Sequence, residues 1–391
     1  MKSAIRVSAI SLSLALVLGA CGGSNSESAD TGSNGVPTKT PPVWSLTGLP
    51  GPDDAQIQPI VVVKIENDPV VRPQTGLERA DMVFEELVEG GATRFAAVYQ
   101  SDLPEEVGPV RSVRHVDVAI AEPMADAFVF SGGARRTMKF VKRKIPTTIS
   151  IVNEGAPGMY RKPGIPAPHD IFLKMNEMLD SIAAKNTPST GFFVRPEVKP
   201  VTASASPAAS ASTSASPKPS STALTGKPVT AVALKFSSFS NPNWKWDATN
   251  KMWMRSEGVK PFLNKDGTQF GTNNLVIIEV REIDAGYKGQ TGGYVPRSVL
   301  TGSGRAWVLS DGKAIEVAWK KPFVDAQMEL TDLDGNPFTM PTGRTWVELL
   351  PVIAEGQTGF TGTYSFNGTL VLIKDFPKPA ATPEPSDSAT P

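Results

Sequence analysis

The sequence is poor in the residues that build covalent and metal-centred sites. One of its 391 residues is cysteine and two are histidine, which excludes an internal disulfide and a zinc site made of histidines and cysteines. It contains neither a Gly-x-Ser-x-Gly nucleophile elbow nor a Walker phosphate loop. The sequence therefore predicts no cofactor and no metal, and leaves an enzymatic activity undecided but disfavoured.

An excess of either charge is also missing. The 39 basic and 39 acidic residues cancel, so no overall positive field exists to attract nucleic acid, and no nucleic-acid partner is expected. No dense polybasic run follows the N-terminal segment. Recognition through charge must therefore be local.

The N-terminus has an apolar run at residues 7–18, preceded by Lys2 and Arg6. The run is too short to span a bilayer stably and predicts a signal peptide over residues 1–20. Leu18-Gly19-Ala20-Cys21 resembles the bacterial lipobox, which makes Cys21 the expected lipidation site. The alternative is a chance cysteine after an ordinary signal peptide. The lipobox implies a diacylglycerol group and often a further acyl chain, enough for stable anchoring on the outer face of the cytoplasmic membrane.

Composition divides the rest of the chain into segments. The pattern predicts an α+β protein, with a mixed α/β domain that contains a β-hairpin and a mainly-β domain after it. Low-complexity stretches separate these domains and end the chain. The expected parts are a flexible tether at 21–42, the α/β domain at 43–198, an Ala/Ser/Pro-rich linker at 199–227, the β domain at 228–352, a further strand within 353–376, and a disordered tail at 377–391.

Hydrophobic periodicity and turn residues predict the elements of both domains. Gly90-Gly91 is expected to close a hairpin between strands 81–88 and 93–100. Asp170 is expected to cap a helix over 171–184. The other predicted elements of the first domain are strands 59–65, 127–130 and 192–194, a helical turn at 77–80, helices 113–124 and 134–144, and an irregular stretch at 145–168. The strands predicted for the second half are 229–236, 244–255, 274–282, 304–309, 315–319, 345–350 and 369–373, with hairpin turns at 310–313 and 334–337.

Acidic groups and arginines alternate with turn residues between residues 66 and 114, where several strands are predicted to end. Guanidinium groups bind phosphate or carboxylate through two parallel hydrogen bonds and keep their charge at physiological pH. The cluster therefore either binds an anionic ligand or forms a structural ion network with neighbouring carboxylates, including Glu85. Its candidate members are Glu66, Asn67, Asp68, Arg72, Glu89, Arg94, Arg111, Ser112, Arg114 and His169.

Two further motifs each allow two interpretations. Ser131-Gly132-Gly133 before a basic helix is either an anion cradle or a tight strand-to-helix turn, and we favour the turn. His169 beside Asp170 is either a general acid–base pair or a structural helix start, and we favour the structural role.

The motifs resemble the YerB-like family of bacterial lipoproteins, a two-domain family without an established activity. The first half carries Ile65-Glu66-Asn67-Asp68, Arg72-Pro73-Gln74-Thr75-Gly76, Glu89-Gly90-Gly91, Gly108-Pro109-Val110-Arg111-Ser112-Val113-Arg114 and Pro168-His169-Asp170. The second half is matched more loosely by Trp253-Met254-Arg255 and Thr345-Trp346-Val347. The resemblance implies an exported, lipid-anchored protein of a Gram-positive type of envelope.

Two functions follow as hypotheses. The first is a non-enzymatic module that binds a cell-wall component or envelope protein through the Arg/Glu cluster. The alternative is an enzyme acting on phosphorylated or lipid-linked cell-wall precursors, with His169 or Asp68 as base. That alternative rests on analogy with the LytR-CpsA-Psr phosphotransferases, although the sequence shows no counterpart of their metal-binding aspartates. The oligomeric state is left open.

Overall fold

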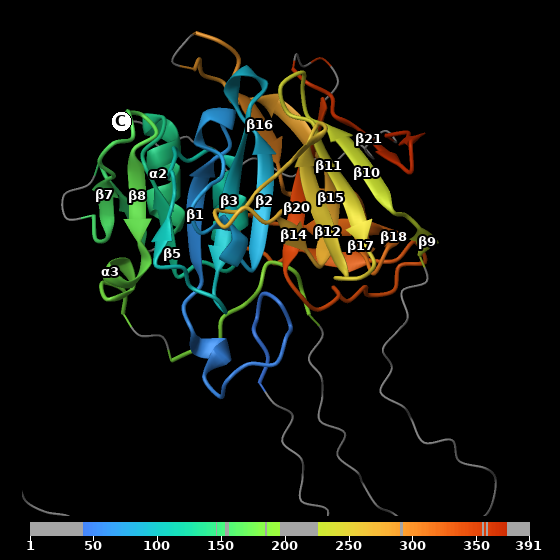
Figure 1. The fold of residues 1–391 in the computed structure, drawn as a ribbon, viewed down its shortest axis with the longest axis horizontal. Helices are drawn as coiled ribbons and strands as arrows, with labels where there is room; N and C mark the ends of the chain where they lie inside the picture. Colours follow the sequence, from blue (N-terminus) through green and yellow to red (C-terminus); the bar gives the residue numbers. More distant parts are fainter. Residues whose placement is uncertain are drawn as a thin grey trace, which may run out of the picture. The chain divides into compact units, whose positions relative to one another are not determined.

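A sheet of twelve strands, to which both halves of the sequence contribute, organises the described part of the chain (Figure 1). The structure is a computed structural model that describes residues 42–145, 147–152, 156–183, 186–195, 226–289, 292–353, 356 and 359–373. In spatial order the sheet contains β19 (Glu329–Thr331), β18 (Lys313–Lys321), β17 (Gly302–Ser310), β15 (Asn274–Asp284), β20 (Thr345–Ile353), β2 (Met82–Leu87), β3 (Thr93–Tyr99), β1 (Val61–Glu66), β5 (Ala127–Phe130) and β6 (Thr148–Ser150), with β16 (Pro296–Val299) beside β15 and β9 (Lys227–Pro228) beside β18.

The two halves join where β2 pairs with β20. The pairing is parallel, with Met82 opposite Thr345 and Glu85 opposite Glu348. Strands far apart in the sequence therefore lie side by side, and the predicted domains share one sheet.

Two smaller sheets cover one face of the large sheet. The first has seven strands and packs over the C-terminal half, and the second has three strands and packs over the N-terminal half; their apolar side chains form one core with this face. The seven strands are β13 (Lys260–Pro261), β12 (Met252–Glu257), β11 (Pro242–Asp247), β10 (Ala231–Lys235), β21 (Thr363–Phe366) and β22 (Thr369–Val371), with β14 (Gly271–Thr272) beside β12; the three are β4 (Glu106–Val107), β8 (Ile171–Lys174) and β7 (Met159–Arg161).

Short helices cover part of the opposite face. Residues of α1 (Val116–Ala121) and Val141 of α2 (Arg135–Lys144) pack with Val62, Phe84 and Ala96 in a second core. The third α-helix, α3 (Met175–Leu179), adjoins β8 instead. Single 3₁₀ turns occur at η1 (Ala55–Ile57), η2 (Pro69–Val71), η3 (Leu77–Arg79) and η4 (Glu89–Gly91).

The predicted α+β class is correct only in outline, because the described residues are much richer in strand than in helix. The hairpin is confirmed: β2 and β3 pair antiparallel, and Gly90 and Gly91 both have positive φ in the turn between them. Strands β1 and β5 and helix α2 also lie where the sequence predicted them, and η3 is the helical turn expected at 77–80.

Several predictions for the first half are wrong. Residues 171–174 form strand β8 rather than the start of a helix, because Ile171, Phe172 and Leu173 are all buried between β4 and β7. Helix α3 is only five residues long, and Asp170 does not cap it. The helix predicted at 113–124 is limited to 116–121. Residues 192–194 make a single bridge from Phe193 to Met328 in place of a strand, and the stretch 145–168 contains the strands β6 and β7.

The second half is β throughout its described residues, as predicted. The prediction of a single strand at residues 244–255 was wrong, because this segment folds as the hairpin β11–β12, which turns at residues 248–251. The strand expected within 353–376 exists as the pair β21–β22. The predicted signal peptide, Cys21 and tether, most of the linker and the C-terminal tail lie outside the described residues.

Candidate functional site

The polar residues lie at the shared end of β1, β2 and β3, and strand alternation assigns them to opposite faces of the sheet. One set of side chains lies on the same side of its strands as Val62, Phe84 and Ala96, which pack against α1. This set, which therefore points to the α1 side, is Lys64, Glu66, Glu86 and Arg94. Glu85 and Thr93 point to the seven-stranded sheet. The single cluster predicted from sequence is therefore two groups on the two faces of one sheet.

The first group, here called the arginine cluster, consists of Arg94, Arg111, Arg114, Glu66, Glu89, Ser112 and His169. The guanidinium of Arg111 lies 2.8 Å from Glu66. Arg114 donates to Oε2 of Glu89 through Nε at 2.9 Å and Nη2 at 2.6 Å. Burial opposes the charge of Glu89, but Arg114 outweighs it and lowers the pKa of the carboxyl.

Arg94 differs from its neighbours because it pairs with no carboxylate among the described residues. Its Nη1 donates to the Ser112 carbonyl at 3.0 Å, and that carbonyl also accepts from Arg114 at 3.2 Å. Burial, followed by the positive charges of Arg114 and Arg111, lowers the pKa of Arg94 to about 9. Three guanidiniums thus share two carboxylates, those of Glu66 and Glu89.

His169 reaches the same cluster from the loop before β8. Its Nδ1 lies 2.8 Å from Oε2 of Glu66, the carboxylate that also holds Arg111. Arg111 in turn donates to the Pro168 carbonyl at 3.0 Å. The histidine, one carboxylate and one arginine are therefore linked, and about a fifth of the His169 and Arg111 side chains is exposed.

A buried ionic group lies beneath the arginine cluster. The ammonium of Lys64 donates to Glu86 and, at 2.8 Å, to Asp117 of α1, and all three side chains are inaccessible to solvent. Asp117 also accepts from the backbone N–H of Arg114 at 2.6 Å, which positions that arginine. Burial and the charge of Asp117 raise the pKa of Glu86 to about 7, although Lys64 opposes the shift.

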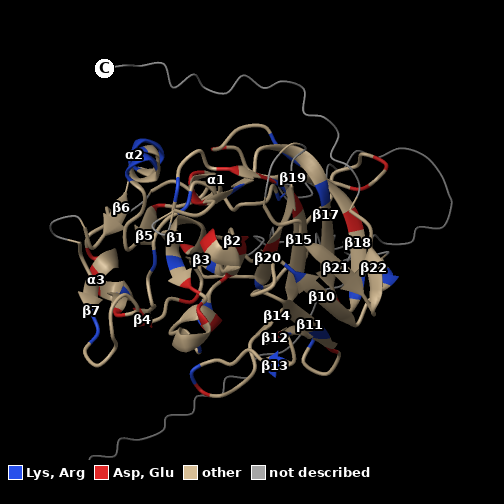
Figure 2. Cartoon of the chain, turned by 90° about the horizontal axis from the view of Figure 1, so that it is seen from above, with Lys and Arg blue, Asp and Glu red and all other residues tan. Residues whose placement is uncertain are grey.

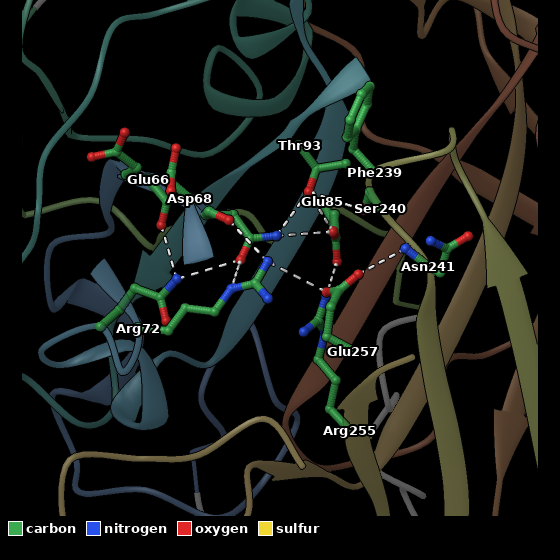
Figure 3. Close-up of polar contacts among 12 residues, drawn as sticks. Glu66, Asp68, Arg72, Glu85, Thr93, Phe239, Ser240, Asn241, Arg255 and Glu257 are labelled. Carbon is green, nitrogen blue, oxygen red and sulfur yellow. Dashed lines mark hydrogen bonds and ion pairs between the residues drawn. The ribbon is translucent and has the colours of Figure 1, made fainter. Parts of the chain in front are cut away.

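The second group, here called the intersheet network, consists of Asn67, Arg72, Glu85, Thr93, Arg255 and Glu257, and it bridges the two sheets (Figure 3). Arg255 of β12 pairs with Glu85 of β2 at 2.9 Å and with Glu257 at 3.2 Å. Arg72 donates to Asn67 and lies 3.5 Å from Glu257. Both arginines of the intersheet network therefore have a carboxylate partner.

Aromatic rings enclose the Arg255 end of this network. The guanidinium carbon lies 4.2 Å from the ring centre of Phe262 and 5.0 Å from that of Trp346. Burial disfavours its charge, but Glu85 and Glu257 raise the pKa of Arg255 overall. The neighbouring Glu348 accepts from Trp244 at 2.8 Å, and burial together with Glu85 raises its pKa well above the usual range.

The structure thus brings seven of the ten candidate residues together and separates three. Asn67 and Arg72 belong to the intersheet network. Asp68 accepts the backbone N–H of Val70 at the start of η2, which is a capping role. Asp170 is held by Arg161 through two bonds of 2.8 and 2.9 Å, so it does not orient His169.

The Ser131-Gly132-Gly133 turn has a packing explanation. A Cβ at Gly133 would lie 2.7 Å from the Val113 side chain, and the backbone N–H of Val113 donates to the Gly132 carbonyl. Glycine is needed there for close approach, as in the tight-turn interpretation.

Sequence reasoning missed the buried partners Lys64, Glu86, Asp117 and Arg255, and the half-buried Glu257. A signal was present for two of them, because Lys64 and Glu86 interrupt apolar runs of β1 and β2. Charged residues are almost never fully buried without partners, so such an interruption indicates a paired charge.

No group of three or more metal-ligating side chains occurs in the described part of the chain. None of the helices found there is long and apolar enough to cross a bilayer.

Comparison with known proteins agrees with this architecture. Residues 46–189 match the model "Protein of unknown function (DUF3048) N-terminal domain", and residues 232–347 match the DUF3048 C-terminal domain. The chain is 25% identical over 311 residues to "Putative lipoprotein YerB" of Bacillus subtilis (strain 168), which covers 78% of this chain and 85% of the relative.

The crystal structure of the YerB protein from Bacillus subtilis superposes with a TM-score of 0.63 at 21% identity, covering 83% of this chain and 99% of that one. The likeness shows a shared fold. The two matched domains and this fold together show that the chain belongs to the DUF3048 family, the YerB-like proteins of unknown function.

Proposed function

We propose that the protein is an exported, lipid-anchored binding module whose arginine cluster holds a phosphate-bearing component of the cell envelope. The lipobox at Cys21 and the lipoprotein name of the Bacillus subtilis relative support export and anchoring. The pairing of the arginines supports the binding role.

Arg94 is the observation that carries the proposal. It is partly buried beside two other guanidiniums, and neither Glu66 nor Glu89 pairs with it. A partly buried cation without a counter-charge destabilises the folded chain, and a bound anion supplies that charge.

The geometry around Arg94 suits a dianionic or pyrophosphate group better than a single carboxylate. Arg111 and Arg114 lie close enough to it that their positive charges lower its pKa. Guanidinium forks match phosphate oxygens, and several can share one phosphate. The carboxylates of Glu66 and Glu89 hold the flanking arginines in place.

Titration calorimetry with inorganic pyrophosphate at pH 7 tests this role. We expect the parent to bind, and Arg94→Gln to weaken binding roughly 10- to 100-fold, the effect of losing a charge-assisted hydrogen bond. Arg79→Gln is the matched control, because Arg79 pairs with Asp102 elsewhere on the fold and the same charge is removed. Equal affinities of parent and Arg94→Gln, or equal losses in both variants, would reject the site.

Anchoring has a separate test. Cys21→Ser removes the thiol that accepts the diacylglycerol, so the chain is expected to move from the membrane fraction to the soluble fraction. Loss of radiolabelled palmitate incorporation checks the chemistry directly. Unchanged labelling and membrane retention would contradict the assignment of Cys21.

A second candidate function is favoured by the contact between His169 and Glu66. A carboxylate at 2.8 Å from Nδ1 orients the imidazole, which suits general acid–base catalysis. The partly exposed ring adjoins Arg111, so a phosphate held by the arginines would lie near it. The alternative is thus an enzyme acting on phosphorylated or lipid-linked wall precursors.

Turnover distinguishes the two functions. The full chain would be incubated with a lipid-linked pyrophosphoryl sugar and divalent cation, with His169→Gln alongside. Turnover that is lost in His169→Gln while pyrophosphate affinity is kept would establish the enzyme. Binding without turnover in both proteins would leave the binding module.

A further inference from the structure

Helix α2 carries the densest charge of one sign in the described part of the chain. Six of its ten residues are basic and none is acidic, and Figure 2 shows the helix in blue at one side of the fold. Thr137 and Val141 are buried against the sheet. The basic side chains are exposed, and they are Arg135, Arg136, Lys139, Lys142, Arg143 and Lys144.

The helix itself gains little from this arrangement. Arg135, Lys139 and Arg143 follow one another at intervals of four, and like charges at that spacing repel. Arg135 and Arg136 also occupy the first turn, where the helix dipole disfavours positive charge, and the N-cap residue Ala134 makes no side-chain cap. Lys144, in the last turn, pairs with Glu122 at 3.3 Å.

We propose that α2 seats the folded chain on the anionic surface of the membrane. Clusters of four to eight Lys and Arg residues attract acidic phospholipids, and the ten-residue helix presents six along about 15 Å. The chain as a whole has no net charge, so attraction to lipid must come from a local concentration of charge such as this helix.

A bilayer is favoured over a soluble polyanion because the expected anchor at Cys21 holds the chain beside lipid. The proposal does not depend on the ligand of the arginine cluster, so either one can fail while the other holds. Seating through α2 would restrain the fold relative to the bilayer in a way that a tether alone does not.

Vesicle binding tests the contact of α2 with an anionic membrane surface. The full chain would carry Cys21→Ser throughout, so that acyl chains contribute nothing, and would be sedimented with vesicles of phosphatidylcholine alone or with 30% phosphatidylglycerol. The test variant is Arg135→Gln/Lys139→Gln/Arg143→Gln. The control is Lys235→Gln/Lys245→Gln/Lys260→Gln, which removes the same charge from exposed lysines of the seven-stranded sheet.

We expect the parent to prefer phosphatidylglycerol vesicles at 0.1 M salt and to lose that preference at 0.5 M. The α2 variant should bind these vesicles roughly 100-fold more weakly, at about fivefold per basic residue, and the control should bind nearly as the parent does. Equal losses in the two variants, or binding by the parent that is independent of salt and phosphatidylglycerol, would overturn the proposal. Dependence on α2 for a soluble glycerol-phosphate polymer but not for vesicles would also overturn it.

Discussion

The arginine cluster and the intersheet network use the same residue types on opposite faces of β2 and β3, yet their charges are balanced differently. Arg255 and Arg72 each reach a carboxylate, and Arg255 is fully buried among aromatic rings. Arg94 is less buried than Arg255 and, among the described residues, reaches only a carbonyl. Balanced and enclosed arginines hold two sheets together, whereas an unbalanced arginine at the rim has a charge available for a ligand.

Removing the fully buried arginine should have the largest effect. Arg255→Met leaves Glu85 buried without its cation, and we expect the free energy of unfolding to fall by about 3–5 kcal/mol. Chemical denaturation measures the change. Arg255→Met/Glu85→Gln should recover part of the loss, because the orphaned charge is then gone. A loss below about 1 kcal/mol in the single variant would remove the contrast between the two groups.

Glu282 should produce the next largest effect, and it depends on pH. Burial raises its pKa to about 8, and Ser298 donates to it at 2.9 Å. The folded chain therefore holds a proton that the unfolded chain releases near pH 4.5. Its stabilising contribution is complete below that pH and is lost as the pH rises to about 8.

Glu282→Gln mimics the protonated carboxyl and should abolish this loss, on the order of 3 kcal/mol between pH 5 and 8. Unfolding free energies measured across that range check the prediction. Glu329→Gln is the control, because Glu329 is exposed on β19. Parallel pH profiles for parent and Glu282→Gln would contradict it.

Arg94→Met should change stability in the opposite direction from Arg255→Met. The lowered pKa of Arg94 means that its charge destabilises the folded chain at every pH below about 9, and the penalty is relieved only above that pH. We expect Arg94→Met to raise the free energy of unfolding by about 1 kcal/mol at pH 7. Arg255→Met should lower it instead, because Glu85 and Glu257 outweigh burial and raise the pKa of Arg255, so that its charge stabilises the folded chain.

Thermal unfolding with and without pyrophosphate separates stability from binding. The parent should gain in Tm with the ligand, and Arg94→Met should start higher but gain nothing. If Arg94→Met were destabilised as strongly as Arg255→Met, Arg94 would be a structural residue like those of the intersheet network.

Ser112 should have the smallest effect. Its carbonyl accepts from Arg94 and Arg114, whereas its hydroxyl makes only a 3.5 Å contact with Ser131. Ser112→Ala keeps the carbonyl, so stability should stay within about 0.5 kcal/mol and pyrophosphate affinity should be unchanged. A tenfold loss of affinity would place the hydroxyl in the ligand site.

Local patterns predicted those parts of the fold in which neighbours in sequence decide the conformation. The Gly90-Gly91 turn specified the β2–β3 hairpin, and the basic segment after Gly133 specified α2. The helix predicted at 171–184 failed because a run of three buried apolar residues suits a strand as well as a helix. The strand was selected by pairing with β4, which lies far away in the sequence, and with β7, which lies in a stretch predicted to be irregular.

The candidate site was predictable as a set of residues and not as an arrangement. Arginines and carboxylates between residues 66 and 114, with His169, were identifiable from their types and from the turns beside them. Their assignment to faces depends on the exact register of β1, β2 and β3, because a shift of one residue exchanges the two sides of a strand. The partners Arg255 and Glu257 lie more than 150 residues away in the sequence from the residues that they contact on β2 and beside η2.

The sequence by itself determined the hairpin, the basic helix and the residues from which a polar site is built; the export signal that it predicts lies outside the described residues. Tertiary structure alone decided that β2 and β20 join the two halves into one sheet and that Arg72 pairs across to Glu257. It also decided that Arg94 has no carboxylate partner among the residues that the structure describes. The physical reason is that charge balance depends on which side chains meet in space. That is set by long-range strand pairing and burial, neither of which is encoded in local composition.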